Sequence, residues 1–172
     1  MPSNIEIKAR VRDFNALRAC AEALSDTSCK IILQEDTFFN SPKGRLKLRL
    51  LVPEQGELIY YERPDMDGPK RSDYHRAACK NPENLKTTLT LALGVRGVVK
   101  KTRYLYLVGQ TRIHLDEVEG LGHFMELEVV MRAGQPDAEG QAIAEKLMAK
   151  LGIQKEDLLN VAYIDLLEAK ME

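Results

Sequence analysis

The segment Phe124-Met-Glu126-Leu-Glu128-Val-Val130 alternates apolar and acidic side chains in the pattern of a β-strand. In a strand, residues two positions apart point to the same face of the sheet. Glu126 and Glu128 therefore project together, while the apolar residues between and beside them face the other way. The segment predicts a strand that has one apolar face and one strongly acidic face.

The same alternation recurs along the chain, and the sign of the charge changes from one segment to the next. Asn4-Ile-Glu6-Ile-Lys8 repeats it at the amino terminus, and Leu46-Lys-Leu-Arg-Leu50 carries it with cations, as do Lys101 and Arg103. In an ordinary half-buried sheet these charged faces would meet water. In a closed barrel covered by helices they would instead line a cavity with carboxylates and cations, suited to a metal ion bound to a polyphosphate. The patterning alone favours neither arrangement.

Length and composition predict one cytoplasmic domain over residues 1–172. A chain of 172 residues, 44% hydrophobic and 30% charged, is ordinary for a globular domain. Its net charge of −1 gives no field that would recruit nucleic acid or an anionic membrane, so we expect neither as a partner. We expect no secretory leader and no membrane-spanning segment. The three cysteines lack C-x-x-C spacing, which argues against a disulfide framework or a zinc site.

Caps and hydrophobic periodicity predict four helices separated by strands. The helices are expected from Asp13 to about Leu24, from Asn81-Pro82 to Leu93, from Pro136-Asp137 to Leu151, and from about Asp157 to Ala169. The strands are expected at about 4–11, 31–39, 45–52, 57–63, 72–79, 98–107, 110–118 and 123–131. Short turns between successive strands imply antiparallel hairpins, so the predicted fold class is α+β.

Six segments, in order along nearly the whole chain, resemble the signature of the CYTH superfamily, also called the triphosphate tunnel metalloenzymes. They are Asn4–Lys8, Gln34–Phe39, Leu46–Arg49, Tyr61–Pro64, Val99–Arg103 and Leu115–Glu128. The branch they resemble most is the CyaB-like one, which includes class IV adenylyl cyclases. Asn4 departs from the signature, because it stands where the family has its first acid. The amide either orients a water near a metal or marks an altered reaction, and both readings stay open.

The resemblance implies an eight-stranded antiparallel closed β-barrel with a polar interior, flanked by helices. It also implies a triphosphate bound inside this tunnel together with Mg²⁺ or Mn²⁺, hard cations that prefer carboxylate and phosphate oxygens. By position, the metal ligands would be Glu6, Asp116, Glu126 and Glu128. The phosphate oxygens would be held by Lys8, Lys47, Arg49, Arg63, Lys101 and Arg103. The catalytic residues would be Glu6, Lys8, Glu126 and Glu128.

The function implied by the resemblance is metal-dependent processing of a triphosphate. We expect a triphosphatase that hydrolyses tripolyphosphate or an organic triphosphate such as ATP or thiamine triphosphate. One alternative is a class IV-type adenylyl cyclase, which makes cyclic AMP and pyrophosphate from ATP; the sequence offers no adenine-reading motif to support it. A second alternative is a non-catalytic module that binds nucleotide or polyphosphate, favoured only by Asn4. We expect a monomer or a homodimer.

Four other residues are weaker candidates for the site. His114 shares a strand face with Asp116 and would line the tunnel, although a lone histidine is more often a hydrogen-bonded structural residue. Lys70 and Arg71 are expected in a loop near a tunnel mouth. Tyr163 resembles the tyrosine of a Y-x-D motif near the end of CyaB-like chains, with packing of the last helix as the alternative role.

Overall fold

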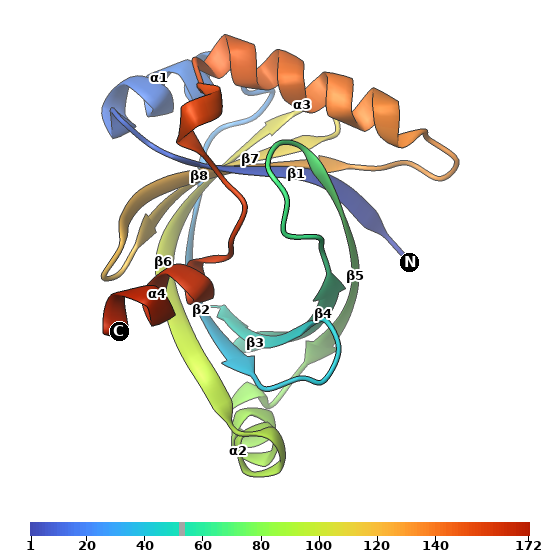
Figure 1. Cartoon of the computed structure of the whole chain (residues 1–172), viewed down its shortest axis with the longest axis vertical. Coiled ribbons are helices and arrows are strands. Elements are labelled where there is room, and N and C mark those ends of the chain that lie inside the picture. Colours follow the sequence, from blue (N-terminus) through green and yellow to red (C-terminus); the bar gives the residue numbers. More distant parts are fainter. Residues whose placement is uncertain (52–53) are drawn as a thin grey trace.

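The computed structural model describes residues 1–51 and 54–172, and in these ranges it contains a nine-stranded sheet and four α-helices (Figure 1). The strands are β1 (Ser3–Arg10), β2 (Lys30–Phe39), β3 (Arg45–Leu51), β4 (Gln55–Glu62), β5 (Lys70–Cys79), β6 (Val95–Val108), β7 (Thr111–Val118), β8 (Gly122–Val130) and β9 (Leu158–Leu159). The helices are α1 (Phe14–Leu24), α2 (Pro82–Leu93), α3 (Asp137–Leu151) and α4 (Tyr163–Met171). Within the described ranges, none of these helices has the length and apolar character needed to cross a bilayer.

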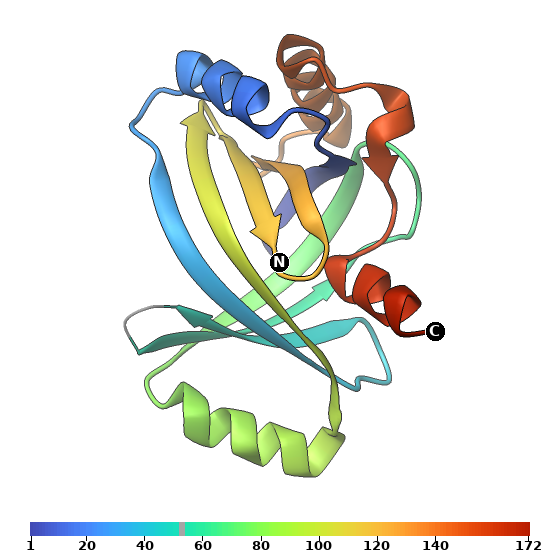
Figure 2. The same ribbon diagram turned by 90° about the vertical axis from the view of Figure 1, so that its left-hand side faces the viewer.

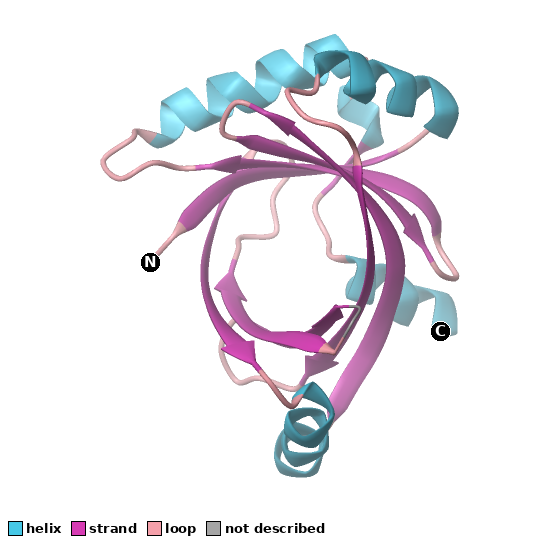
Figure 3. Cartoon of the chain, turned by 180° about the vertical axis from the view of Figure 1, so that it is seen from behind, coloured by secondary structure: helices cyan, strands magenta, loops and turns pink. Residues whose placement is uncertain are grey.

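Eight of the strands close into an antiparallel barrel, which Figure 3 shows as a ring around a central opening. The strand order is β5-β4-β3-β2-β6-β7-β8-β1, and β1 pairs back with β5. Residues 3–6 of β1 pair with β5, whereas Lys8 and Ala9 pair with β9. The short strand β9 thus supplies backbone hydrogen-bond partners to the part of β1 that lies beyond its pairing with β5. The predicted α+β fold with an eight-stranded closed barrel is confirmed, and β9 is an addition to it.

The last helix begins later than the predicted range 157–169. Leu158–Leu159 form β9 on the edge of β1, and α4 starts only at Tyr163. The Asp165 carboxylate accepts a hydrogen bond from the backbone N–H of Ala162 at 2.8 Å, which fixes this start. The prediction was wrong here because two leucines continue an apolar pattern equally well in a helix and in a short buried strand.

Three other predicted boundaries also differ from the structure. β6 begins at Val95, earlier than the predicted start at residue 98. Lys70 and Arg71 were expected in a loop, but they are the first residues of β5, and Lys70 pairs with Glu6 on β1. β4 begins at Gln55, two residues before the predicted start at 57. The end of the strand predicted at 45–52 falls on residue 52, outside the described ranges.

The outer face of the wall formed by β1, β7 and β8 is apolar and is covered by α1 and α3. Figure 2 shows both helices lying above the strands. Ile7 of β1 and Leu127 of β8 point outward and are buried, in the same cluster as Leu17 of α1 and Leu147 of α3. This packing leaves the other face of the same strands, with its charged residues, turned toward the barrel interior.

One end of the barrel interior is apolar rather than polar. Phe38, Val99 and Phe124 come from β2, β6 and β8 and are buried in one cluster. Tyr163 and Ile164, at the start of α4, pack against them. The C-terminal segment therefore completes an apolar layer at this end of the interior.

Gly140 of α3 lies where a methyl group would have no room. A Cβ atom at this position would lie 2.5 Å from Met131 Sδ and 2.7 Å from Ile5 Cγ1. Glycine to alanine in an exposed helix usually stabilises by about 1 kcal/mol, whereas overpacking a core costs about 1–3 kcal/mol. We expect Gly140→Ala to lower the free energy of unfolding, measured by urea denaturation.

The control for this substitution is Lys146→Ala, on the exposed side of the same helix. It should change the free energy of unfolding by no more than about 0.5 kcal/mol. An increase in stability in Gly140→Ala would contradict the close packing of α3 on the barrel.

Candidate functional site: a charged cavity inside the barrel

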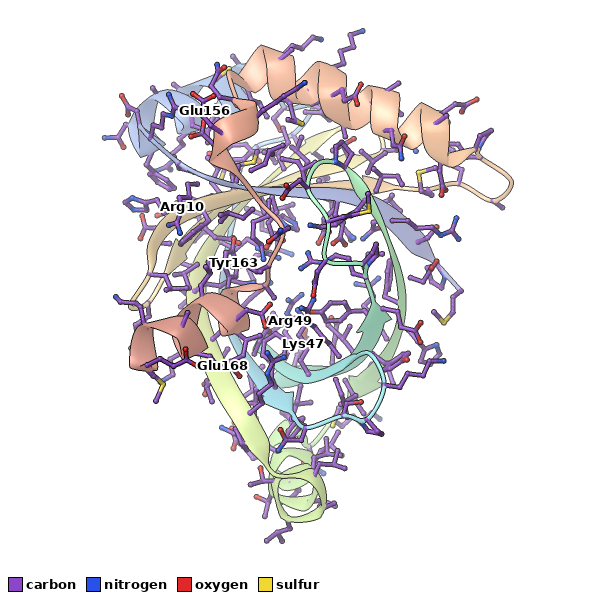
Figure 4. The ribbon with its side chains drawn as sticks, viewed as in Figure 1. Arg10, Lys47, Arg49, Glu156, Tyr163 and Glu168 are labelled. Atoms are coloured by element: carbon purple, nitrogen blue, oxygen red, sulfur yellow. The ribbon has the colours of Figure 1, made fainter. Side chains whose placement is uncertain are left out.

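The barrel encloses a cavity of about 570 Å³, lined by side chains from all eight of its strands. Figure 4 shows Lys47 and Arg49 beside the central opening, with Arg10 and Glu168 away from it. Most residues predicted for the site line this cavity; they are Glu6, Lys8, Lys47, Arg49, Arg63, Lys101, Arg103, Glu126 and Glu128. Of the two arrangements that the sequence pattern allowed, the structure therefore has the one with the charged faces inside.

Three glutamates stand on neighbouring strands at one side of the cavity. Glu6 of β1 lies directly opposite Glu128 of β8, and Glu126 is two residues away along β8. Burial and the charge of Glu128 raise the pKa of Glu6 to about 7, even though Arg63 Nη1 lies 3.7 Å from Glu6 Oε2. Burial acts on Glu126 and Glu128 in the same direction, but the charges of Lys8 and Arg103 hold the pKa of Glu126 well below its usual range, and His114 and Arg112 lower the pKa of Glu128 to about 2. Glu6 is thus the one glutamate of the three whose pKa is raised.

His114 of β7 borders the glutamates. It lies opposite Glu126, and its Nδ1 is 3.9 Å from Glu126 Oε2 and 3.9 Å from Glu128 Oε1. Burial and the charge of Arg103 lower the pKa of His114, which favours the neutral imidazole. Across the described part of the chain, its Nδ1 finds no hydrogen-bond partner. A neutral, buried nitrogen thus faces two carboxylates.

Asn4 stands beside the same group without adding charge to it. Its Nδ2 donates a hydrogen bond to Glu6 Oε1 at 3.2 Å, and its buried Oδ1 has no partner among the residues that the structure describes. Carboxylate oxygens, an amide oxygen and a neutral imidazole are all donors that divalent cations accept. Among the described residues, Asn4 Oδ1 and His114 Nδ1 have no hydrogen-bond partner, and with the carboxylates beside them they fit the divalent metal that the CYTH resemblance implies.

Asp36 of β2 organises the basic side of the cavity. Its carboxylate accepts hydrogen bonds from Arg49 Nε at 2.8 Å, Arg49 Nη2 at 2.9 Å and Lys47 Nζ at 3.2 Å, and Lys101 Nζ lies 3.8 Å away. Burial alone would raise the pKa of Asp36, but the charges of Arg49 and Lys47 hold it well below its usual range. Burial and the charge of Arg49 lower the pKa of Lys47 to about 7, against the opposite effect of Asp36.

Asp116 lies behind Arg103 and, within the described ranges, is not among the residues that line the cavity. Its carboxylate accepts two hydrogen bonds from Arg103, each 2.7 Å long, and one from the Tyr163 hydroxyl at 2.8 Å. The side chain is fully buried. The structure therefore places this predicted metal ligand against a predicted phosphate-binding cation, whose Nη2 in turn lies 3.4 Å from Glu126 Oε2.

The C-terminal segment contributes Tyr163 to the cavity. Lys8 Nζ lies 3.9 Å from the centroid of the Tyr163 ring and 3.4 Å from Glu126 Oε1, and it donates a hydrogen bond to the Val161 carbonyl at 3.4 Å. Lys101 Nζ lies 5.0 Å from the same ring. Tyr163 therefore helps to position two of the predicted phosphate-binding lysines, in addition to packing the last helix.

Asp36 and Arg112 are cavity residues that were not predicted to act in the site. Asp36 lies two residues from Gln34 in a predicted strand, so alternation placed it on a definite face but did not say which cations it meets. Arg112 Nη2 lies 2.9 Å from Glu128 Oε2, across the β7–β8 pair. Such partners depend on strand register, which one sequence does not give.

The raised pKa of Glu6 predicts a pH dependence of the metal-free protein. A carboxyl whose pKa rises from 4.5 to about 7 on folding favours the folded state below pH 4.5, and this contribution is lost as the pH rises through 7. We expect wild type to lose stability relative to Glu6→Gln over this window, by at most about 3 kcal/mol at about 1.4 kcal/mol per pKa unit.

The measurement is urea denaturation in EDTA at several pH values between 4.5 and 7.5. Glu126 and Glu128, which face Glu6, have lowered pKa values and stay ionised over this pH window, so the change in slope reports Glu6. Glu145→Gln, an exposed change on α3, is the control and should follow wild type. A stability difference between wild type and Glu6→Gln that is constant with pH would contradict the raised pKa of Glu6.

Comparison with known proteins finds relatives that match along nearly their whole length. A family model of the CYTH domain matches residues 3–163. The adenylate cyclase CyaB of Aeromonas hydrophila is 25% identical, with 97% of this chain and 90% of that protein covered. A Methanocaldococcus jannaschii protein provisionally named as an adenylate cyclase is 26% identical, with 94% and 97% covered.

Solved structures share the same architecture. The PH1012 protein of Pyrococcus horikoshii OT3 is 28% identical and superposes with a TM-score of 0.82, with 95% of this chain and 98% of that chain covered. A Hippeastrum protein described as having a dominant triphosphatase activity is 16% identical and superposes with a TM-score of 0.66, with 94% and 91% covered. With the family model matched from β1 to the start of α4, the chain belongs to the CYTH domain family.

Proposed function

We propose that this protein is a metal-dependent triphosphatase that binds a triphosphate inside the barrel and hydrolyses it. The observation that carries the proposal is one cavity with three glutamates on neighbouring strands at one side and a cluster of cations around Asp36 at the other. Burial and nearby carboxylates raise the pKa of Glu6, while burial and nearby cations lower the pKa of Lys47. A divalent cation would stabilise the ionised form of Glu6, and a polyphosphate anion would stabilise the charged form of Lys47. Tripolyphosphate, thiamine triphosphate and ATP all carry the required chain of phosphates.

The basic residues would bind and orient the phosphate oxygens. Arg49 and Arg103 are each fixed by a buried carboxylate, Asp36 and Asp116 respectively, so little side-chain freedom would be lost on binding. Hydrogen bonds between such cations and phosphate contribute about 1.5–3 kcal/mol each. The remaining members of the set are Lys8, Lys47, Arg63 and Lys101. In this proposal Asp116 supports the site through Arg103.

Glu6, Glu126 and Glu128 would hold the metal, with Mg²⁺ and Mn²⁺ as the hard cations that suit carboxylates. When bound, the metal would neutralise charge on the phosphate oxygens. Hydrolysis joins a water oxygen to phosphorus and breaks a phosphoanhydride bond, so two phosphate products leave. Such a reaction asks the protein mainly for positioning and for electrostatic stabilisation of the transferred group. Lys8, 3.4 Å from Glu126, would stabilise charge that develops next to the metal site.

A class IV-type adenylyl cyclase is the second candidate, and the names of the two curated relatives favour it. In that reaction the ribose 3′-oxygen of ATP attacks the α-phosphorus, and pyrophosphate leaves. Both reactions would use the same cations and carboxylates, and they differ in which phosphorus atom the nucleophile attacks. A third candidate, a module that binds without turnover, has Asn4 in place of the first acid as its support.

The experiment that separates these candidates offers the protein three substrates with Mg²⁺ or Mn²⁺. Tripolyphosphate, ATP and thiamine triphosphate are incubated separately, and phosphate, pyrophosphate and cyclic AMP are measured in each reaction. The proposal expects phosphate release that stops when EDTA is added. Cyclic AMP with equimolar pyrophosphate would establish the cyclase instead, and binding without any product would establish the third candidate.

Glu126→Gln tests the acidic side directly. The amide keeps the shape of the side chain but removes the charge that would hold the metal beside Lys8 and Arg103. We expect phosphate release to fall by two orders of magnitude or more, on the order of the effect of removing one catalytic electrostatic group, with partial rescue by excess Mn²⁺. Glu145→Gln, exposed on α3, should retain wild-type activity. Wild-type turnover in Glu126→Gln would rule out this role.

A further inference from the structure

His114 lies at the acidic side of the cavity and has no role in the triphosphatase mechanism proposed above. We propose, on the basis of that proposed function, that His114 binds the metal through Nδ1, together with Glu126 and Glu128. The centre would then be a mixed nitrogen and oxygen site that favours Mn²⁺ over Mg²⁺.

The placement of His114 supports a role as a ligand. Its side chain is 6% exposed, and its Nδ1 lies 3.9 Å from one oxygen of Glu126 and 3.9 Å from one oxygen of Glu128. The three donor atoms lie within 4.8 Å of one another. Metal bonds to imidazole and carboxylate are about 2.0–2.2 Å long, so two donors on one ion stand up to about 4.4 Å apart. Only a small side-chain shift would bring all three donors onto one cation.

A purely structural role for His114 would need a hydrogen bond that the geometry does not provide. A separation of 3.9 Å is too long for an N–H···O bond to either carboxylate. No other acceptor or donor in the described ranges meets this nitrogen. Buried polar atoms are nearly always partnered in folded proteins, so an orphan nitrogen directed at two carboxylates calls for a ligand between them.

Asn4, on the β1 side of the acidic group, supports the choice of His114 as a metal ligand. Asn4 turns its Nδ2 toward Glu6, at 3.2 Å from Oε1, so it adds no anionic oxygen on the β1 side. The β7 side adds the neutral nitrogen of His114. Carboxylates suit Mg²⁺ and Mn²⁺, whereas imidazole suits later transition metals, and Mg²⁺ binds it least well of these ions. The metal ligands in this proposal therefore lie on the β7 side of the acidic group, and the nitrogen ligand makes the site favour Mn²⁺ over Mg²⁺.

The test is pulsed EPR of the Mn²⁺-loaded protein, prepared without a polyhistidine tag, because this method detects a nitrogen nucleus bound directly to the metal. We expect nitrogen coupling in wild type and in His123→Gln, whose histidine is exposed at the start of β8, and none in His114→Gln. Isothermal titration should show that His114→Gln loses about tenfold in Mn²⁺ affinity and much less in Mg²⁺ affinity.

Loaded wild type that lacks nitrogen coupling would overturn the assignment, as would coupling that persists in His114→Gln. The spectrum of wild type decides the question even if the variant fails to fold. Phosphate release from tripolyphosphate with Mg²⁺ is measured in parallel on wild type. Turnover without nitrogen coupling would reject His114 alone, whereas the absence of both turnover and triphosphate binding would reject the proposed function.

Discussion

The pairing of opposite charges inside a closed barrel is the constraint on which the rest of this structure depends. A buried ion costs several kcal/mol unless a partner and further hydrogen bonds compensate it. Asp36 with Arg49 joins β2 to β3, and Asp116 with Arg103 joins β6 to β7. Each pair holds a cation in one orientation inside the cavity. The interactions that make burial tolerable therefore also arrange the cations in advance of any ligand.

The candidate site lies where these charged side chains line one cavity. Glutamates from β1 and β8 stand at one side of it, and the cations around Asp36 stand at the other. The two sides belong to one cavity, so a single ligand with a positive and a negative part would satisfy both. His114 and Asn4 border the acidic side with an imidazole nitrogen and an amide, which add no negative charge to it. Of these two residues, Asn4 stands where the family signature has its first acid.

The alternation of apolar and charged residues predicted most of the strands, and the resemblance decided that their charged faces point inward. Alternation did not predict the register between strands or how deeply each side chain is buried. It placed Asp116 on the correct face, but not behind Arg103, where two 2.7 Å hydrogen bonds occupy it. It also missed β9, because the two leucines of that strand pair with β1 only where the closed barrel leaves a free edge. Long-range partners such as Tyr163 and Asp116 follow from the fold, not from local pattern.

The central claim is that a metal and a triphosphate occupy the barrel interior together. The most direct measurement is a crystal structure with Mn²⁺ and imidotriphosphate, whose P–N–P bridges resist hydrolysis, with Mn²⁺ located by anomalous scattering. The account predicts an anomalous peak beside Glu126 and Glu128 and phosphate oxygens about 2.7–3.2 Å from the guanidinium groups of Arg49 and Arg103. A ligand bound only on the outer surface, with no anomalous peak inside the barrel, would contradict it.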